Sequence, residues 1–138
     1  MSAHEVLQAA ADLVSAFARN DRAAYFGAFT ADASFVFYTL PQPLLSRDAY
    51  QAVWDSWRRD EGFEVLSCTS SNAVVSLQGD VAIFIHDVAT ELRMNGEQFF
   101  SQAPESVIMP LIIPPQLGAS RISDIAMPRD CAQSGSAV

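Results

Sequence analysis

The feature of this sequence that most constrains its fold is an Asn95-Gly96 pair that ends a long stretch with strand character, residues 81–93. An Asn-Gly pair favours a two-residue turn between antiparallel strands. Strands that pair symmetrically about this turn place position 86 directly opposite position 105, with both side chains on one face of the sheet. We therefore expect a hairpin that brings His86 and Glu105 together.

The rest of the C-terminal half also has strand character. Residues 63–77 form a long, Ser-rich segment that we expect to be a bulged strand, joined by a Gln-Gly-Asp turn to the stretch described above. After the Asn-Gly turn we expect a strand over 97–113 that is interrupted by Pro104, where a bulge would shift the pairing by one residue. A final strand is expected over 121–127.

The N-terminal part has helical character. Apolar residues between positions 6 and 17 recur at the 3.6-residue spacing of one helix face. A short second helix carries Tyr25 and Phe26, and a strand is expected over 34–39. Ser46 is a typical N-cap for a third helix, which closes at Gly62.

This order, helices first and long strands afterwards, predicts an α+β fold with helices on one face of a curved antiparallel sheet. The 138 residues are the size of one domain. We assign residues 1–128 to that domain, with 110–128 the doubtful part, and 129–138 to a flexible tail.

Composition narrows the choice of partners. The formal net charge is −8, with eight Arg and no Lys, so nucleic acid is a poor partner because phosphate contacts need clustered cations. Every apolar run is too short to span a membrane, and the N-terminus lacks the basic start of a signal peptide. Two cysteines, Cys68 and Cys131, do not make a disulfide framework. We expect a cytoplasmic protein.

Several segments resemble a known superfamily. Ala31-Asp32-Ala33 leading into Phe35-Val36-Phe37, the run from Gly79 to Phe84 that precedes His86-Asp87, and the Asn95-Gly96 turn are similar to those of nuclear transport factor 2-like proteins. The resemblance covers about residues 5–109 and is nearest to the SnoaL-like and ketosteroid-isomerase-like branches. It implies a cone with an apolar pocket between sheet and helices, and commonly a homodimer. A shared fold does not by itself give a function.

The resemblance can be carried over residue by residue. Ketosteroid isomerases use an Asp base and an oxyanion hole made of a Tyr and a protonated Asp. Their base falls near Phe37 of this chain, their Tyr near Leu13, and their protonated acid at Glu105. Since one of three members is present, and as Glu rather than Asp, steroid isomerisation by that mechanism is not expected.

His86 and Glu105 are the candidate catalytic pair. His86 lies in an alternating, mostly apolar row, where an imidazole can act as acid or base near neutral pH. Glu105 on the same pocket wall would exchange a proton with it. The alternatives are a core histidine with both nitrogens hydrogen-bonded, and a solvent-facing glutamate on an edge strand.

The candidate ligand-binding residues are apolar or aromatic, and Trp54 and Trp57 could stack on a flat ligand at the pocket mouth with Tyr38. Plain packing of helix against sheet is the alternative for the two tryptophans. Asp87 and Asp124 are weaker candidates, because aspartates in such positions are more often surface charges. The ligand-binding set is Phe37, Trp54, Trp57, Phe84 and Val88.

Other chemistries find little support in the sequence. It holds no dinucleotide-binding, Walker or HExxH motif, and its two His and two Cys have no zinc-binding spacing. We therefore expect no cofactor and no metal. Spacing does not exclude a Ser-His-acid triad, although no nucleophile elbow is present. Two hypotheses remain: an acid–base enzyme acting on an apolar small molecule (an isomerase, cyclase or hydratase), or a non-catalytic ligand-binding or dimerisation module.

Overall fold

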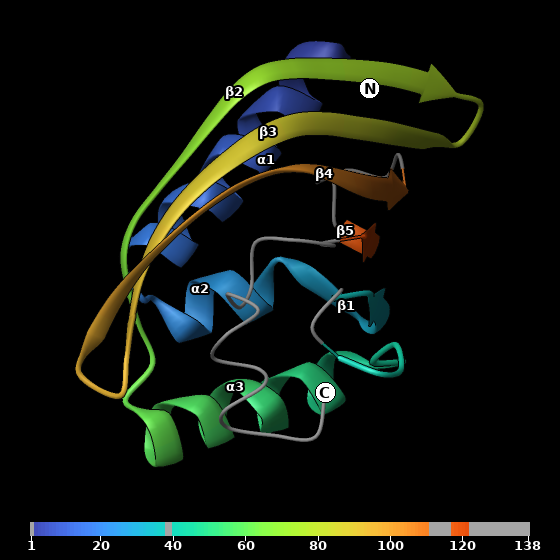
Figure 1. Cartoon of the computed structure of the whole chain (residues 1–138). Helices are drawn as coiled ribbons and strands as arrows, with labels where there is room; N and C mark the ends of the chain where they lie inside the picture. Colours follow the sequence, from blue (N-terminus) through green and yellow to red (C-terminus); the bar gives the residue numbers. More distant parts are fainter. Residues whose placement is uncertain (1, 38–39, 111–116, 122–138) are drawn as a thin grey trace.

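The computed structural model describes residues 2–37, 40–110 and 117–121. The second and third helices lie within the curve of a strongly bent sheet, and the first runs behind its long strands in this view (Figure 1). This is the α+β arrangement that the order of elements predicts. In chain order the elements are α1 (Ala3–Ala18), α2 (Arg22–Gly27), β1 (Phe29–Phe35), α3 (Arg47–Glu61), β2 (Glu64–Gln78), β3 (Val81–Met94), β4 (Glu97–Pro110) and β5 (Leu117–Arg121).

The five strands of the described chain form one open sheet in the order β1-β5-β4-β3-β2. Neighbouring strands are antiparallel except for β1 and β5, which pair in parallel. The three longest strands, β2, β3 and β4, arch together over the helices (Figure 1). They form the wall on which the candidate site is built.

The β3–β4 hairpin has the register that the sequence predicts. Asn95 and Gly96 both have positive φ, at 53° and 78°, as a primed two-residue turn requires. His86 stands opposite Glu105, and the pairing runs without a shift through the whole hairpin. No bulge interrupts the pairing at Pro104, so the register is not shifted there. In the described chain β5 pairs only with residues 106–108 of β4, so Pro104 occupies a stretch without a strand on its other side, where a missing N–H is tolerated.

Two expected strand boundaries are wrong. The first strand spans Phe29–Phe35 rather than 34–39, because Phe35 forms a two-way backbone bridge with Leu44 that turns the chain away. The last strand spans Leu117–Arg121, whereas most of the expected range, 122–127, lies outside the described residues. In both cases the pairing partner is distant in sequence and leaves no local signal.

The core is an aromatic cluster centred on α3. Tyr50, Trp54 and Trp57 lie on one face of this helix, and all three are buried. Trp54 makes edge contacts with Phe26 from α2 and with Phe63 ahead of β2. Ser46 caps the helix, and Gly62 closes it in the left-handed conformation, as the sequence predicts.

Asn20 links the helices to the sheet. Its side-chain Nδ2 donates to the Val65 carbonyl oxygen, and its Oδ1 accepts from the Val65 N–H, both at 2.8 Å. The amide thus occupies the place of a strand neighbour next to the β2 bulge between Val65 and Ser67. Asn20 itself has φ 57°, a conformation that Asn tolerates better than most residues. This contact fixes the start of the strand that carries Cys68 and Ser70.

We predict that Asn20→Gly lowers the free energy of unfolding by about 1–3 kcal/mol, because two partly buried hydrogen bonds are lost. Asn20→Ala should cost about 1 kcal/mol more, since alanine is strained at positive φ. Urea unfolding of both variants measures the difference. Equal stability of the Gly variant and the unmodified protein would show that the amide does not hold β2.

Candidate functional site

Three neighbouring strands bring together a chain of hydrogen-bonded side chains. Ser70 Oγ on β2 lies 2.6 Å from Nδ1 of His86 on β3. His86 Nε2 lies 2.7 Å from Oε1 of Glu105 on β4. Ser70 is level with Val88, the neighbour of His86 on the same face, so its hydroxyl reaches the ring diagonally across the strands. The cross-strand geometry that the hairpin predicts therefore places His86 and Glu105 in direct contact.

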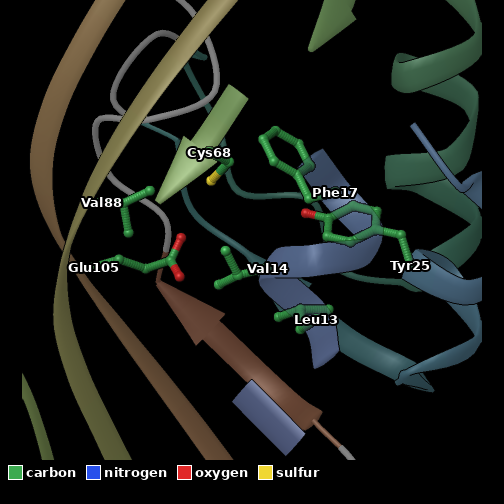
Figure 2. Close-up of a pocket in the computed structure, with 7 residues that line it drawn as sticks. All are labelled: Leu13, Val14, Phe17, Tyr25, Cys68, Val88 and Glu105. Atoms are coloured by element: carbon green, nitrogen blue, oxygen red, sulfur yellow. The ribbon is translucent and has the colours of Figure 1, made fainter. Parts of the chain in front are cut away.

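His86 and Glu105 are both buried, with exposed fractions of 2% and 4%. A buried carboxylate is costly unless it is paired, and the imidazole satisfies one of its two oxygens. The second oxygen, Oε2, has no hydrogen-bond partner among the described residues. Figure 2 shows the carboxyl group directed into a pocket between the sheet and α1. Glu105 thus presents a free acceptor to whatever occupies this space.

The pocket is narrow and mostly apolar. It encloses about 270 Å³ of empty space, part of it open to solvent, and the centre of a water molecule can reach about 20 Å³ of that space. The inner part therefore has room for a group about the size of one water. Its described lining consists of Leu13, Val14, Phe17, Tyr25, Cys68, Val88 and Glu105.

Tyr25 supplies a second polar group. Its hydroxyl points into the pocket (Figure 2) and lies 3.0 Å from the hydroxyl of the buried Tyr50. Burial raises the pKa of Tyr25 well above 10, and the Tyr50 hydroxyl and the negative charge of Glu105 raise it further. Burial also raises the pKa of Tyr50. Tyr25 therefore stays a neutral O–H group that can donate a hydrogen bond.

Cys68 completes the polar part of the lining. Its Sγ lies 3.6 Å from Thr90 Oγ1. Burial raises the pKa of the Cys68 thiol to about 11, against a lowering effect of the Thr90 hydrogen bond. Since the thiolate is the reactive form, this thiol is chemically quiet at neutral pH.

The predicted ligand-binding residues are divided between pocket and core. Val88 lines the pocket, and the Phe84 ring packs on His86 with centroids 4.5 Å apart. Phe37 and Trp57 pack against each other in the aromatic core, which also buries Trp54. Ligand contacts by these five residues stay a prediction.

The weaker candidates lie elsewhere. Asp87 Oδ2 accepts a hydrogen bond from Asn72 Nδ2 at the exposed sheet edge. Tyr38 and Asp124 lie outside the described residues.

Sequence reasoning missed two polar members of the site, Tyr25 and Ser70. Tyr25 sits among aromatic residues of a short helix and looks like core. Ser70 is one of several serines on β2, and two bulges, between Val65 and Ser67 and between Ser71 and Val74, hide its register. The periodic patterns of the sequence offer no signal for either residue, apart from the open possibility of a Ser-His-acid chain.

Within the described ranges, no group of three or more His, Cys, Asp or Glu side chains is placed to hold a metal ion. None of the helices described for this chain combines the length and apolarity of a membrane-spanning segment. The chemistry open to the pocket's own side chains is proton transfer. Glu105 Oε2 can accept a proton, and Tyr25 can donate a hydrogen bond to an oxygen that gains negative charge.

Comparison with known proteins agrees with this architecture. Residues 6–102 match the family model described as SnoaL-like domain. No curated protein matches the sequence. An NTF2-like protein from Cytophaga hutchinsonii has a similar structure, with a TM-score of 0.72 and 13% identity over 92% of this chain and 100% of that chain.

Two further structures have the same TM-score of 0.72. One is a ketosteroid isomerase-like protein from Erwinia carotovora atroseptica, 18% identical over 90% of this chain and 96% of that one. The other is the beta subunit of the benzoate 1,2-dioxygenase from Burkholderia mallei, 11% identical over 90% and 91%. At such identities the likeness shows the fold alone.

Because the pKa of Cys68 is raised to about 11, we predict slow alkylation of this thiol by iodoacetamide at pH 7.5. The rate should rise about tenfold per pH unit up to at least pH 10, as the thiolate fraction grows. Mass spectrometry of a Cys131→Ser variant follows Cys68 alone, and a variant that also carries Cys68→Ser gives the background. A rate that levels off near pH 8.5 would contradict the raised pKa of this partly buried thiol.

Proposed function

We propose that this chain, which belongs to the SnoaL-like domain family within the NTF2-like superfamily, is a cofactor-independent enzyme that transfers protons on an apolar small molecule carrying a carbonyl group. The observation that carries the proposal is the free oxygen of Glu105, buried and directed into an apolar pocket opposite the Tyr25 hydroxyl.

Glu105 acts as the base in this proposal. Its Oε1 is hydrogen-bonded to His86 at 2.7 Å, which orients the carboxylate so that Oε2 is available to a substrate. A C–H group next to a carbonyl gives its proton to Oε2, and the same carboxyl group returns it at the original or a neighbouring carbon. The imidazole acts as a positioning group, because it contacts the carboxylate rather than the substrate.

Tyr25 stabilises the oxygen that becomes negative when the C–H proton leaves. The Tyr25 and Tyr50 hydroxyls share one hydrogen bond, which uses one of their two protons and leaves the other free to donate elsewhere. When Tyr50 donates to Tyr25, the O–H of Tyr25 is left to donate into the pocket. A preorganised donor in a water-poor site is among the larger contributions to catalysis. The lining by Leu13, Val14, Phe17 and Val88 favours an apolar substrate body.

A second candidate is a ligand-binding module without catalysis. Two observations favour it: Leu13 lines the pocket where ketosteroid isomerases carry their tyrosine, and Phe37 stands near the position of their base. In that case Tyr25 and Glu105 would select a ligand with one polar group and leave it unchanged.

The test uses 2-tetralone, an apolar bicyclic ketone, in D2O. Because the inner part of the pocket holds a group about the size of one water, we expect the carbonyl end of the ketone to enter it while the rings stay in the part open to solvent. We predict that the protein accelerates deuterium uptake at the carbons next to the carbonyl, measured by NMR. Glu105→Gln should reduce that acceleration roughly 10²–10⁴-fold, the range for a general base. Tyr25→Phe should reduce it roughly 10²-fold. Tyr50→Phe should reduce it less, since Tyr50 contacts Tyr25 and does not line the pocket among the described residues.

Glu64→Gln is the matched control, because Glu64 is an exposed carboxylate of β2 paired with Arg93; this variant should retain full activity. Binding of 2-tetralone without exchange would favour the binding module. Exchange that survives in Glu105→Gln would refute the assigned base.

We further propose that the protein is a cytoplasmic homodimer that associates through the sheet face opposite His86. Ile85 and Val74 are paired neighbours on that face, 42% and 59% exposed. Ile108, on the same face beside Ile83, is also 42% exposed. Monomers rarely leave a contiguous aliphatic patch open to water.

For the dimer we predict a mass near 30 kDa by light scattering at micromolar concentration, twice the 15.0 kDa of one chain. Ile85→Glu should shift the population towards 15 kDa, because a carboxylate would be buried at the interface. Leu45→Glu changes a more exposed apolar residue, 72% exposed, away from the patch, and should leave the mass unchanged. A single 15 kDa species in the unmodified protein would contradict the proposal.

A further inference from the structure

We propose that Ser70, His86 and Glu105 form a proton relay that connects the carboxyl group in the pocket with water outside the sheet. The relay deepens the proposed function, because it lets the base exchange its proton with solvent while a substrate fills the pocket. Its existence, however, depends only on the geometry of the three side chains and can be tested without any substrate.

The three groups form an unbroken line from the pocket to the surface. Glu105 is at the inner end, 4% exposed, with Oε2 in the pocket. His86, 2% exposed, occupies the middle, and Ser70 is an exposed residue of the edge strand β2. Both links, 2.6 Å and 2.7 Å, are short for hydrogen bonds to nitrogen.

Each of the three groups can receive a proton from its neighbour on the solvent side and release one to its neighbour on the pocket side. In the resting arrangement the Ser70 O–H donates to Nδ1, and the His86 Nε2–H donates to the carboxylate. A proton from water then binds to Ser70 Oγ, the original hydroxyl proton passes to Nδ1, and the Nε2 proton passes to Oε1. The result is a neutral carboxylic acid and a neutral imidazole that carries its proton on Nδ1.

The reverse sequence returns the proton to water and restores the first tautomer. Rotation of the carboxyl group by half a turn about its Cγ–Cδ bond exchanges Oε1 and Oε2. A proton taken from a substrate in the pocket can therefore reach the side of the carboxyl group that faces His86. No proton or electron is gained or lost in the cycle.

The other groups around Glu105 do not offer a second route. Tyr25 from α2 holds its proton tightly, since its pKa is raised well above 10. Cys68 from β2 does the same, with its pKa raised to about 11. The α1 residues that line the pocket, Leu13, Val14 and Phe17, are apolar. Among the described residues that surround the carboxyl group, His86 is thus the one that is hydrogen-bonded both to Glu105 and to a side chain on the exposed side.

The order of Ser70, His86 and Glu105 relative to the pocket also differs from that of a hydrolytic triad. In a triad the serine faces the substrate pocket, and the acid orients the imidazole and stabilises its protonated form. Here the serine is at the exposed end, and the acid has its free oxygen in the pocket. The same three residue types therefore serve proton movement between pocket and solvent.

Ser70→Val and Ser70→Thr provide a matched pair for the test. The two side chains have the same shape, but Val has no hydroxyl, and its methyl groups keep water from Nδ1. The C=O stretching band of protonated Glu105 is identified by infrared difference spectroscopy as the band that Glu105→Gln abolishes. An equilibrium titration first finds the pH range in which the band forms. The rate of its appearance is then followed after a laser-induced release of protons in that range.

We expect Ser70→Thr to form the band within about twofold of the unmodified rate and Ser70→Val at least tenfold more slowly, with both variants folded. Equal rates in the Val variant and the unmodified protein would overturn the relay. Failure to find any band that depends on Glu105 would overturn it as well, because the carboxylate must receive the proton. Either result leaves the 2-tetralone exchange to be judged on its own data.

Discussion

A single buried contact, from the His86 imidazole to the Glu105 carboxylate, sets the conditions for the rest of this structure. A carboxylate that is 4% exposed requires a partner, and only a strand pairing without a shift places an imidazole nitrogen 2.7 Å away. One residue of slippage would turn Glu105 to the outer face. The primed turn at Asn95-Gly96 enforces that register and so belongs to the site, although it lies far from the pocket.

The aromatic core gives this pair its surroundings. The α3 residues Tyr50 and Trp54 pack against Tyr25 of α2, which directs the Tyr25 hydroxyl into the pocket. The core thereby supplies the donor that faces the carboxylate, and the low polarity of the lining strengthens any hydrogen bond formed there. The same residues therefore stabilise the core and position the donor of the pocket.

The sequence predicted those parts of the fold that depend on local patterns. Helical spacing and caps placed the helices, and the Asn-Gly turn fixed the contact between His86 and Glu105. The strand β1 was misplaced, and β5 begins earlier than predicted, because their pairing joins segments more than 80 residues apart. Tyr25 and Ser70 were missed for a related reason. A tyrosine among phenylalanines looks like core, and a serine beyond a bulge has no predictable face.

The central claim is that Glu105 is held from one side by His86 so that its other oxygen serves the pocket. NMR of protein labelled with ¹⁵N-histidine at pH 7 tests this most directly, with the exposed His4 as internal reference. We predict a slowly exchanging Nε2–H signal from His86, coupled to its nitrogen, that shifts in Glu105→Gln and has no counterpart for His4. An imidazole proton of His86 that exchanges as fast as that of His4, or a signal unchanged in Glu105→Gln, would contradict the account.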